Sequence, residues 1–230
     1  MSVNLPFLLF AIFLLWFPRQ WMRQGLSIWN RRKQRSERVV RRTEEPWNVA
    51  EPGDPAVRFG AEFKKLRNYV DVLRAAAGSV ANMGGFGLEA CVETDSGTTA
   101  MLAEVLALKI AILLVGLLIQ TVRYERQRLL FFAPIFYLLG LSVGLCGGRA
   151  ALFAFALVCT VNPMLKNPQG FLAVYAVTIG AFGYFFADNG AVRSIVAVVF
   201  FLLPVLLSML ADRPLVLFSR RGTRMPSVPS

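Results

Sequence analysis

Residues 129–147 form the stretch LLFFAPIFYLLGLSVGLCG, which contains no charged side chain. Three stretches of the same character follow it along the chain, at 150–165, 170–187 and 194–211. A transmembrane helix needs about 20 predominantly apolar residues, and a globule of 230 residues cannot bury so many long apolar runs. The four stretches therefore predict four membrane-spanning helices.

Two further apolar segments precede these four, and neither is a simple span. Residues 100–120 carry Glu104 and Lys109 inside the apolar run, and residues 5–17 are short unless the segment is extended to 3–22. The sequence leaves open whether 3–22 and 100–120 cross. We expect an all-α fold, a multi-pass transmembrane helical bundle of about 5–6 spans, with the N-terminus outside.

The composition divides the chain into four regions. They are an N-terminal transmembrane anchor (1–22), a polar basic region (23–99), the transmembrane helical bundle (100–211) and a basic C-terminal tail (212–230).

An apolar stripe within the polar region predicts an amphipathic helix over 57–77. The stripe recurs every three or four residues and is formed by Phe59, Phe63, Leu66, Val70, Leu73 and Ala77. Such a helix lies on the membrane surface, docks on the bundle or packs against a partner protein. The Gly-rich residues 78–98 that follow predict a flexible loop.

The formal net charge of +11 comes from 25 Lys and Arg against 14 Asp and Glu. Residues 19–42 hold nine of these basic residues and one acid, which by the positive-inside rule places residues 23–99 in the cytoplasm, beneath an inner or plasma membrane. The candidate contacts to anionic lipid headgroups are Arg31, Arg32, Lys33, Arg35, Arg38, Arg41 and Arg42. Expected partners are the bilayer and proteins that bind the transmembrane helices. Nucleic acid is disfavoured, because no recognisable nucleic-acid module surrounds the cluster.

The positive-inside rule also produces a conflict. Residues 19–42, the basic stretch 121–128 and the Arg-bearing tail all belong on the cytoplasmic side. Four crossings after residue 128 return the tail to the side of 121–128. A single crossing by 100–120, however, places 121–128 opposite 19–42. Either 100–120 does not simply cross, or one group of charges lies on the wrong side.

Gly140, Gly144 and Gly148 are spaced four apart and share one face of the predicted helix. In lipid, small residues let helix backbones approach closely and so drive packing. The small residues that face them on the next two segments are Ala150, Ala151, Ala154, Ala173, Ala176 and Gly180. These stripes predict a compact bundle of the three segments. Alternatively Gly148 belongs to a turn, which leaves a single GxxxG motif.

The sequence has no histidine and three widely spaced cysteines, Cys91, Cys146 and Cys159. The lack of histidine excludes a Ser-His-Asp triad, a Cys-His dyad and HExxH zinc chemistry, and the cysteine spacing excludes a CxxC motif. We identify no catalytic, cofactor-binding or metal-binding residue, and the sequence favours a protein that is not an enzyme.

Three functions stay open. The features above favour a non-catalytic subunit or scaffold of a membrane complex. One alternative is a transporter or channel component, with Glu104 and Lys109 as an intramembrane polar pair that lines a path. The other is a membrane enzyme that acts on lipid-linked substrates, with Arg149, Asp188 and Arg193 as its interfacial charges.

Overall fold

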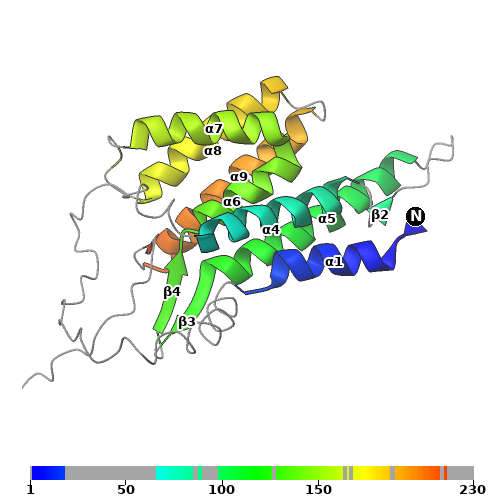
Figure 1. The fold of residues 1–230 in the computed structure, drawn as a ribbon, viewed down its shortest axis with the longest axis horizontal. Helices are drawn as coiled ribbons and strands as arrows, with labels where there is room; N and C mark the ends of the chain where they lie inside the picture. The colour runs from blue at the N-terminus through cyan, green and yellow to red at the C-terminus, as the bar shows by residue number, and fades with distance from the viewer. Residues whose placement is uncertain are drawn as a thin grey trace, which may run out of the picture.

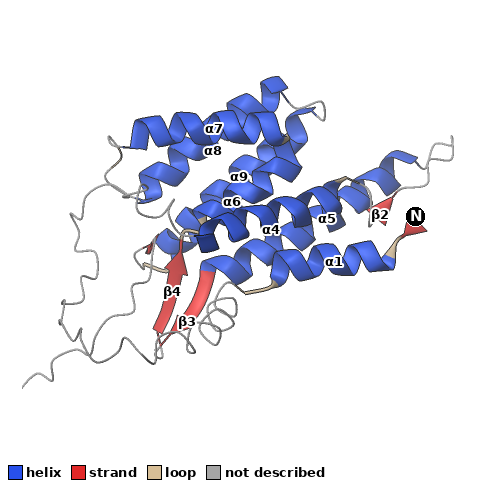
Figure 2. Ribbon diagram, viewed as in Figure 1, coloured by secondary structure: helices blue, strands red, loops and turns tan. Residues whose placement is uncertain are grey.

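The computed structural model is predominantly helical in the residues it describes, which are 2–18, 66–84, 88–89, 98–125, 128–162, 165, 168–186, 190–212 and 215–216. The described helices are α1 (Leu5–Trp16), α4 (Leu66–Met83), α5 (Thr98–Thr121), α6 (Ile135–Cys146), α7 (Gly148–Val161), α8 (Pro168–Phe186) and α9 (Gly190–Leu210). The described strands are β1 (Ser2–Val3), β2 (Leu88–Glu89), β3 (Val122–Glu125), β4 (Arg128–Phe132) and β5 (Leu215–Val216) (Figures 1 and 2).

Three of the described helices are long and apolar enough to cross a membrane. These candidate spans are Leu102–Thr121 within α5, Pro168–Phe186 and Ala191–Leu210. The other apolar helices, α1, α6 and α7, are shorter, at 12 to 14 residues. The structure thus supports a helical membrane protein. Residues 100–120, whose crossing the sequence left open, form the longest of these apolar helices.

The predicted helix over 129–147 begins later than expected. Residues Arg128–Phe132 form β4, which pairs antiparallel with β3, so the described residues of the basic stretch 121–128 lie at the end of α5 and in paired strands. The physical reason is Pro134, because a proline disfavours helical geometry in the residue before it. The remaining α6 has 12 residues and is about 18 Å long, well short of a full span.

The short strands mark the two ends of the bundle. Because β1 pairs with β2, the start of α1 lies beside the connection between α4 and α5, at what we call the far end. Because β3 pairs with β4 and β4 pairs with β5, the end of α5, the start of α6 and the end of α9 meet at the opposite end, which we call the hairpin end (Figure 1).

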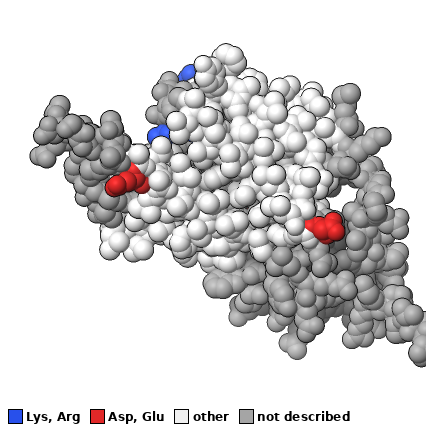
Figure 3. All heavy atoms as spheres, turned by 180° about the vertical axis from the view of Figure 1, so that it is seen from behind, with Lys and Arg blue, Asp and Glu red and all other residues white. Residues whose placement is uncertain are grey.

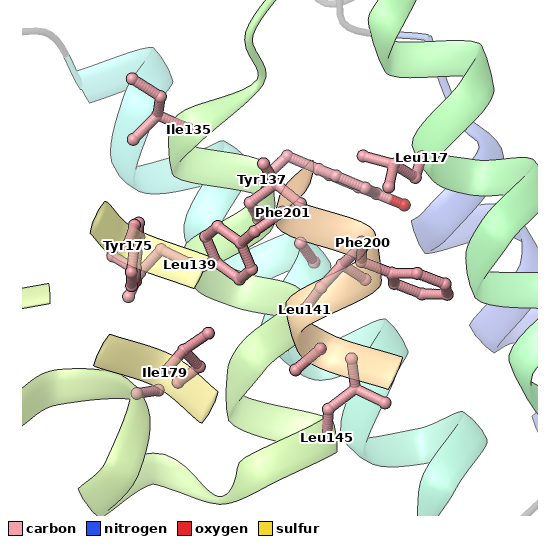
Figure 4. Packing of buried hydrophobic residues seen from close by; sticks show 14 of the residues in the cluster. Leu117, Ile135, Tyr137, Leu139, Leu141, Leu145, Tyr175, Ile179, Phe200 and Phe201 are labelled. Atoms are coloured by element: carbon pink, nitrogen blue, oxygen red, sulfur yellow. The ribbon is translucent and has the colours of Figure 1, made fainter. Parts of the chain in front are cut away.

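α6 is the central helix and separates two groups. We call α1, α4 and α5 the N-terminal group, and α7, α8 and α9 the C-terminal group. Every residue of α6 from Ile135 to Ser142 is buried. Figure 4 shows Tyr137 extending from α6 toward Leu117 on α5, and Leu139 lying nearer Tyr175 and Phe201. A helix enclosed on all sides is apolar all round, and so its sequence shows no polar face.

The C-terminal group packs through aromatic and small side chains. The rings of Tyr175 on α8 and Phe201 on α9 lie 4.2 Å apart between centroids, and those of Phe153 and Phe186 stack at 5.7 Å between α7 and α8. α9 continues through Pro204, which lies inside the helix and is buried. The described surface seen from behind is largely uncharged, with charged atoms only at its margins (Figure 3).

Candidate functional site

α4 turns its polar side toward the rest of the bundle. The buried polar side chains on this helix, all at most 8% exposed, are Asn68, Asp71, Arg74, Ser79 and Asn82. Leu66 and Leu73, two members of the predicted apolar stripe, are instead 76% and 69% exposed. A helix that docked on the bundle through this stripe would show the opposite pattern. α4 therefore docks on the bundle through its polar face, and the predicted apolar stripe faces outward.

The bounds of α4 also differ from those predicted. The helix extends to Met83, so the first part of the predicted loop 78–98 is helical, while residues 57–65 lie outside the described part of the chain. Gly78 and Ser79 have modest helix propensity. They are held in α4 by tertiary packing, because Gly78 lies against Leu14 and Leu15 of α1, and Ser79 lies against Gly144 of α6.

Arg74 occupies the centre of this polar face. Its guanidinium donates to the carbonyl oxygen of Phe17 and forms a salt bridge with Asp71, one turn earlier on α4, at 3.3 Å. The same guanidinium lies over the ring of Tyr137, 5.6 Å from the centroid, in cation–π geometry. A buried cation thus has an anion, a carbonyl and an aromatic face as neighbours.

The end of α1 explains why these donors gather here. The last carbonyls of a helix have no partner within the helix, and Pro18 has no N–H with which to satisfy one. Side chains of three other helices supply the donors. Gln120 Nε2 donates to Phe17 O at 3.0 Å, and the Tyr137 hydroxyl donates to Leu15 O at 3.0 Å. We call this set the carbonyl clasp: Arg74, Gln120 and Tyr137 on the carbonyls of Leu15 and Phe17.

Similar bonds tie the other helix pairs of the N-terminal group. Trp16 Nε1 on α1 donates to the carbonyl of Ile112 on α5 at 3.0 Å. Asn82 Nδ2 on α4 donates to the carbonyl of Lys109 at 2.9 Å. Each bond runs from a side chain to a backbone carbonyl, so each fixes the position of one helix against the backbone of another.

The predicted glycine face packs on α4. A Cβ atom at Gly140 would lie 2.5 Å from both Ala75 Cβ and the Val72 carbonyl oxygen, and one at Gly144 would lie 2.5 Å from the backbone of Ser79. Ser79 Oγ also donates to the Gly140 carbonyl at 3.0 Å. The close approach therefore joins α6 to α4, a helix outside the three predicted segments.

Gly148 stands apart from the other two glycines. α6 ends at Cys146, and Gly147 adopts a φ of 84° at the turn into α7, a left-handed conformation that glycine adopts without strain. A Cβ at Gly148 would meet nothing within 4 Å. Gly148 is the first residue of α7 and not part of α6, so one GxxxG motif, Gly140 and Gly144, remains on α6.

The predicted polar pair is not brought together. Glu104 is exposed on α5, whereas Lys109 is 8% exposed and faces the bundle. Five residues along a helix correspond to a rotation of about 140°, which accounts for the separation. Arg149 is exposed near the start of α7 and Arg193 is half-buried near the start of α9, both at the far end. Asp188 and the seven candidate headgroup contacts from Arg31 to Arg42 lie outside the described residues.

The signal that sequence reasoning missed is a second stripe on α4. Asn68, Asp71, Ser79 and Asn82 follow helical spacing on the side opposite Leu66 and Leu73. The apolar stripe is the more conspicuous pattern, but the polar stripe marks the buried face of α4. Small neighbours such as Ala75, which is fully buried, and Gly78 allow the polar side to approach other backbones.

Among the residues that the structure describes, no cluster of three or more Cys, Asp or Glu is placed to hold a metal ion. Cys146 is buried and Cys159 half-buried, both as free thiols. The chain matches no protein-family model, no curated protein and no solved structure. The geometry of the bundle is thus the basis for any functional assignment.

Proposed function

We propose that this chain is a non-catalytic subunit or scaffold of a membrane complex, whose helices hold a basic polar region at the cytoplasmic surface. The proposal rests on the acceptors of the buried side-chain donors, which are backbone carbonyls on other elements. Six side chains reach from one element to another and donate to a backbone carbonyl: Trp16, Arg74, Ser79, Asn82, Gln120 and Tyr137. Polar groups used in this way fix the helices of the chain against one another, and such a rigid bundle supports a scaffold role.

The separation of Glu104 from Lys109 counts against a polar path between them. A path needs its ionisable groups to face one water-filled interior. Here one group faces outward and the other faces the bundle. The exposed Glu104 instead lies on a surface open to headgroups or to a neighbouring subunit.

The subunit proposal is tested by purifying the tagged chain from its native membrane in mild detergent and measuring the protein mass by light scattering. We expect a fixed partner and a mass above the 25.5 kDa of the chain. Gly140→Ala, which forces α6 away from α4, should reduce partner recovery, and Gly148→Ala, which meets open space, should not. Recovery of the wild-type chain alone at 25.5 kDa would contradict the proposal.

The basic region also supports a role in anchoring to anionic lipid. Each Lys or Arg near an anionic surface contributes about 1 kcal/mol of attraction. Replacing the basic residues from Arg31 to Arg42 by Gln should abolish the enrichment of anionic lipid around the chain in mixed-lipid nanodiscs, measured by the lipid that co-purifies. Equal enrichment for both forms would show that this segment does not bind headgroups.

A further inference from the structure

We infer that α4 crosses the bilayer, with its outward apolar face in contact with lipid acyl chains. The exposed positions on this helix include Leu66, Val70, Leu73 and Val80, while the five polar side chains named above, from Asn68 to Asn82, are buried. A helix lying flat on a membrane surface turns its polar side to water. A helix inside a bilayer does the reverse, because its polar groups face the bundle interior. α4 has the second arrangement.

The length and position of α4 fit a crossing. Its 18 residues extend about 27 Å, close to the thickness of a hydrocarbon core. The helix runs antiparallel to α1, with Arg74 beside Phe17 and Gly78 beside Leu15. It runs parallel to α6, with Ala75 beside Gly140. α4 therefore extends alongside two apolar helices through the depth of the bundle.

Partners inside the bundle let α4 carry its buried polar side chains into the bilayer, although Arg74 Nε and Asn82 Oδ1 make no hydrogen bond to the described residues. Arg74 has Asp71 and the Phe17 carbonyl, and Asn82 has the Lys109 carbonyl. Hydropathy counts the polar residues of a helix without regard to the side they occupy. The described side chains of α4 that face outward, such as Leu66, Val70 and Leu73, are ones that lipid tolerates.

The charges of the connecting segments support this path independently. The segments attached at the hairpin end are 19–65, 122–134, 162–167 and 213–230, and together they hold 20 of the 25 Lys and Arg. Residues 84–97, attached at the far end between α4 and α5, hold Glu89, Glu93 and Asp95 with no Lys or Arg. Such an imbalance is what the positive-inside rule requires if the hairpin end is cytoplasmic.

A crossing by α4 removes the conflict between the basic segments. Residues 19–42 and 121–128 are then separated by two crossings, α4 and α5, and come to the same side. The helices alternate in direction along the chain, so the N-terminus lies outside and the C-terminus in the cytoplasm. Under this inference the expected cytoplasmic region 23–99 is divided: residues 23–65 stay inside, and 84–97 lie outside.

The native Cys91 allows a direct test in the full chain. Cys91 lies between α4 and α5, and Ser36→Cys provides a reporter between α1 and α4. The form with Cys91 as reporter carries Cys159→Ser, and the form with Ser36→Cys as reporter carries both Cys91→Ser and Cys159→Ser. Cys146 is kept in both forms because it is buried. In sealed vesicles of one orientation, a membrane-impermeant maleimide should reach the two reporters from opposite sides. Labelling of both from the same side would overturn the inference.

A second test asks what contacts the outward apolar face of α4. A nitroxide is attached at Leu73→Cys, in a Cys91→Ser, Cys159→Ser background. Leu73 is 69% exposed, and Val177→Cys on α8, where the native residue is 72% exposed, is the matched control. Lipid contact predicts that both nitroxides are more accessible to oxygen than to a water-soluble nickel complex. Greater accessibility to nickel at Leu73→Cys would place α4 in water. Protection from both reagents would place a second chain on this face. Either result overturns the inference.

Discussion

α8 and α9 pack through apolar and aromatic side chains such as Tyr175 and Phe201, whereas α4 packs on α1, α5 and α6 through polar side chains that donate to backbone carbonyls. Both groups turn apolar residues outward, Val177 on α8 and Leu73 on α4. The outer surfaces are alike and the inner surfaces differ. Hydropathy averaged along a helix therefore detects α8 and α9 and misses α4.

The largest expected effect comes from removing the cation at the centre of the N-terminal group. Arg74→Met removes the buried salt bridge to Asp71 and one donor to the Phe17 carbonyl. Breaking a buried ion pair from one side costs about 3–5 kcal/mol. Unfolding in mixed micelles should show a loss of free energy of that size.

A double variant separates the charge from the packing. Asp71→Leu together with Arg74→Met removes both members of the pair, and we expect it to be less destabilised than Arg74→Met alone. If Arg74→Met unfolds at the same point as the wild type, the clasp does not hold the N-terminal group together.

The next effect tests the close approach of α6 to α4. Gly140→Ala places a methyl group against the backbone of Val72 and Ala76, which cannot move independently of α4, and overpacking of this kind costs about 1–3 kcal/mol. Gly148→Ala meets open space and serves as the matched control, with a change of less than about 0.5 kcal/mol. Thermal unfolding of the two variants in the same detergent decides between them. Equal midpoints would show that α4 and α6 are not in contact.

A smaller effect is expected from changing two buried tyrosines. Tyr137 reaches the N-terminal group, and Tyr175 lies in the C-terminal group. Tyr137→Phe removes the hydrogen bond to the Leu15 carbonyl and should cost about 0.5–1.5 kcal/mol. The Tyr175 hydroxyl makes no hydrogen bond of good geometry within the described part of the chain, so Tyr175→Phe should cost less than Tyr137→Phe. Equal unfolding free energies for the two variants would remove the distinction between a polar and an apolar interior.

The smallest expected effect is at Glu104. Because this side chain is exposed and lies apart from Lys109, Glu104→Gln should change the unfolding free energy by no more than about 0.5 kcal/mol. Proton or solute flux into reconstituted vesicles should be the same for both forms. A flux in the wild type that disappears in Glu104→Gln would favour the transporter alternative.

The sequence predicts the helical class and the apolar segments of the C-terminal group well, because those helices are apolar around most of their circumference. It does not predict the start of α6, since β4 pairs with the adjacent β3 and with β5, which lies more than 80 residues later in the chain. It also misses the carbonyl clasp. The acceptors of the clasp are the backbone carbonyls of Leu15 and Phe17, and no side chain at those positions indicates them.

The GxxxG motif shows the same limit. The spacing of Gly140 and Gly144 predicts a helix face that another backbone approaches, and the structure has such an approach. The spacing does not identify the partner. Ala75 and Ser79 face these glycines from α4, a helix whose average composition is too polar to suggest a place inside the bundle.

The central claim is that α1 and α4 run antiparallel through the same membrane. Its most direct test is a disulfide between Ser2→Cys and Glu89→Cys, in a Cys91→Ser background. Ser2 and Glu89 are Cα partners in the β1–β2 pair, so their Cα atoms lie within disulfide range. With a protease site inserted between α1 and α4, oxidised chains in native membranes should stay joined after cleavage and separate on reduction. Modification of the two cysteines by an impermeant reagent from opposite sides of the membrane would contradict the claim.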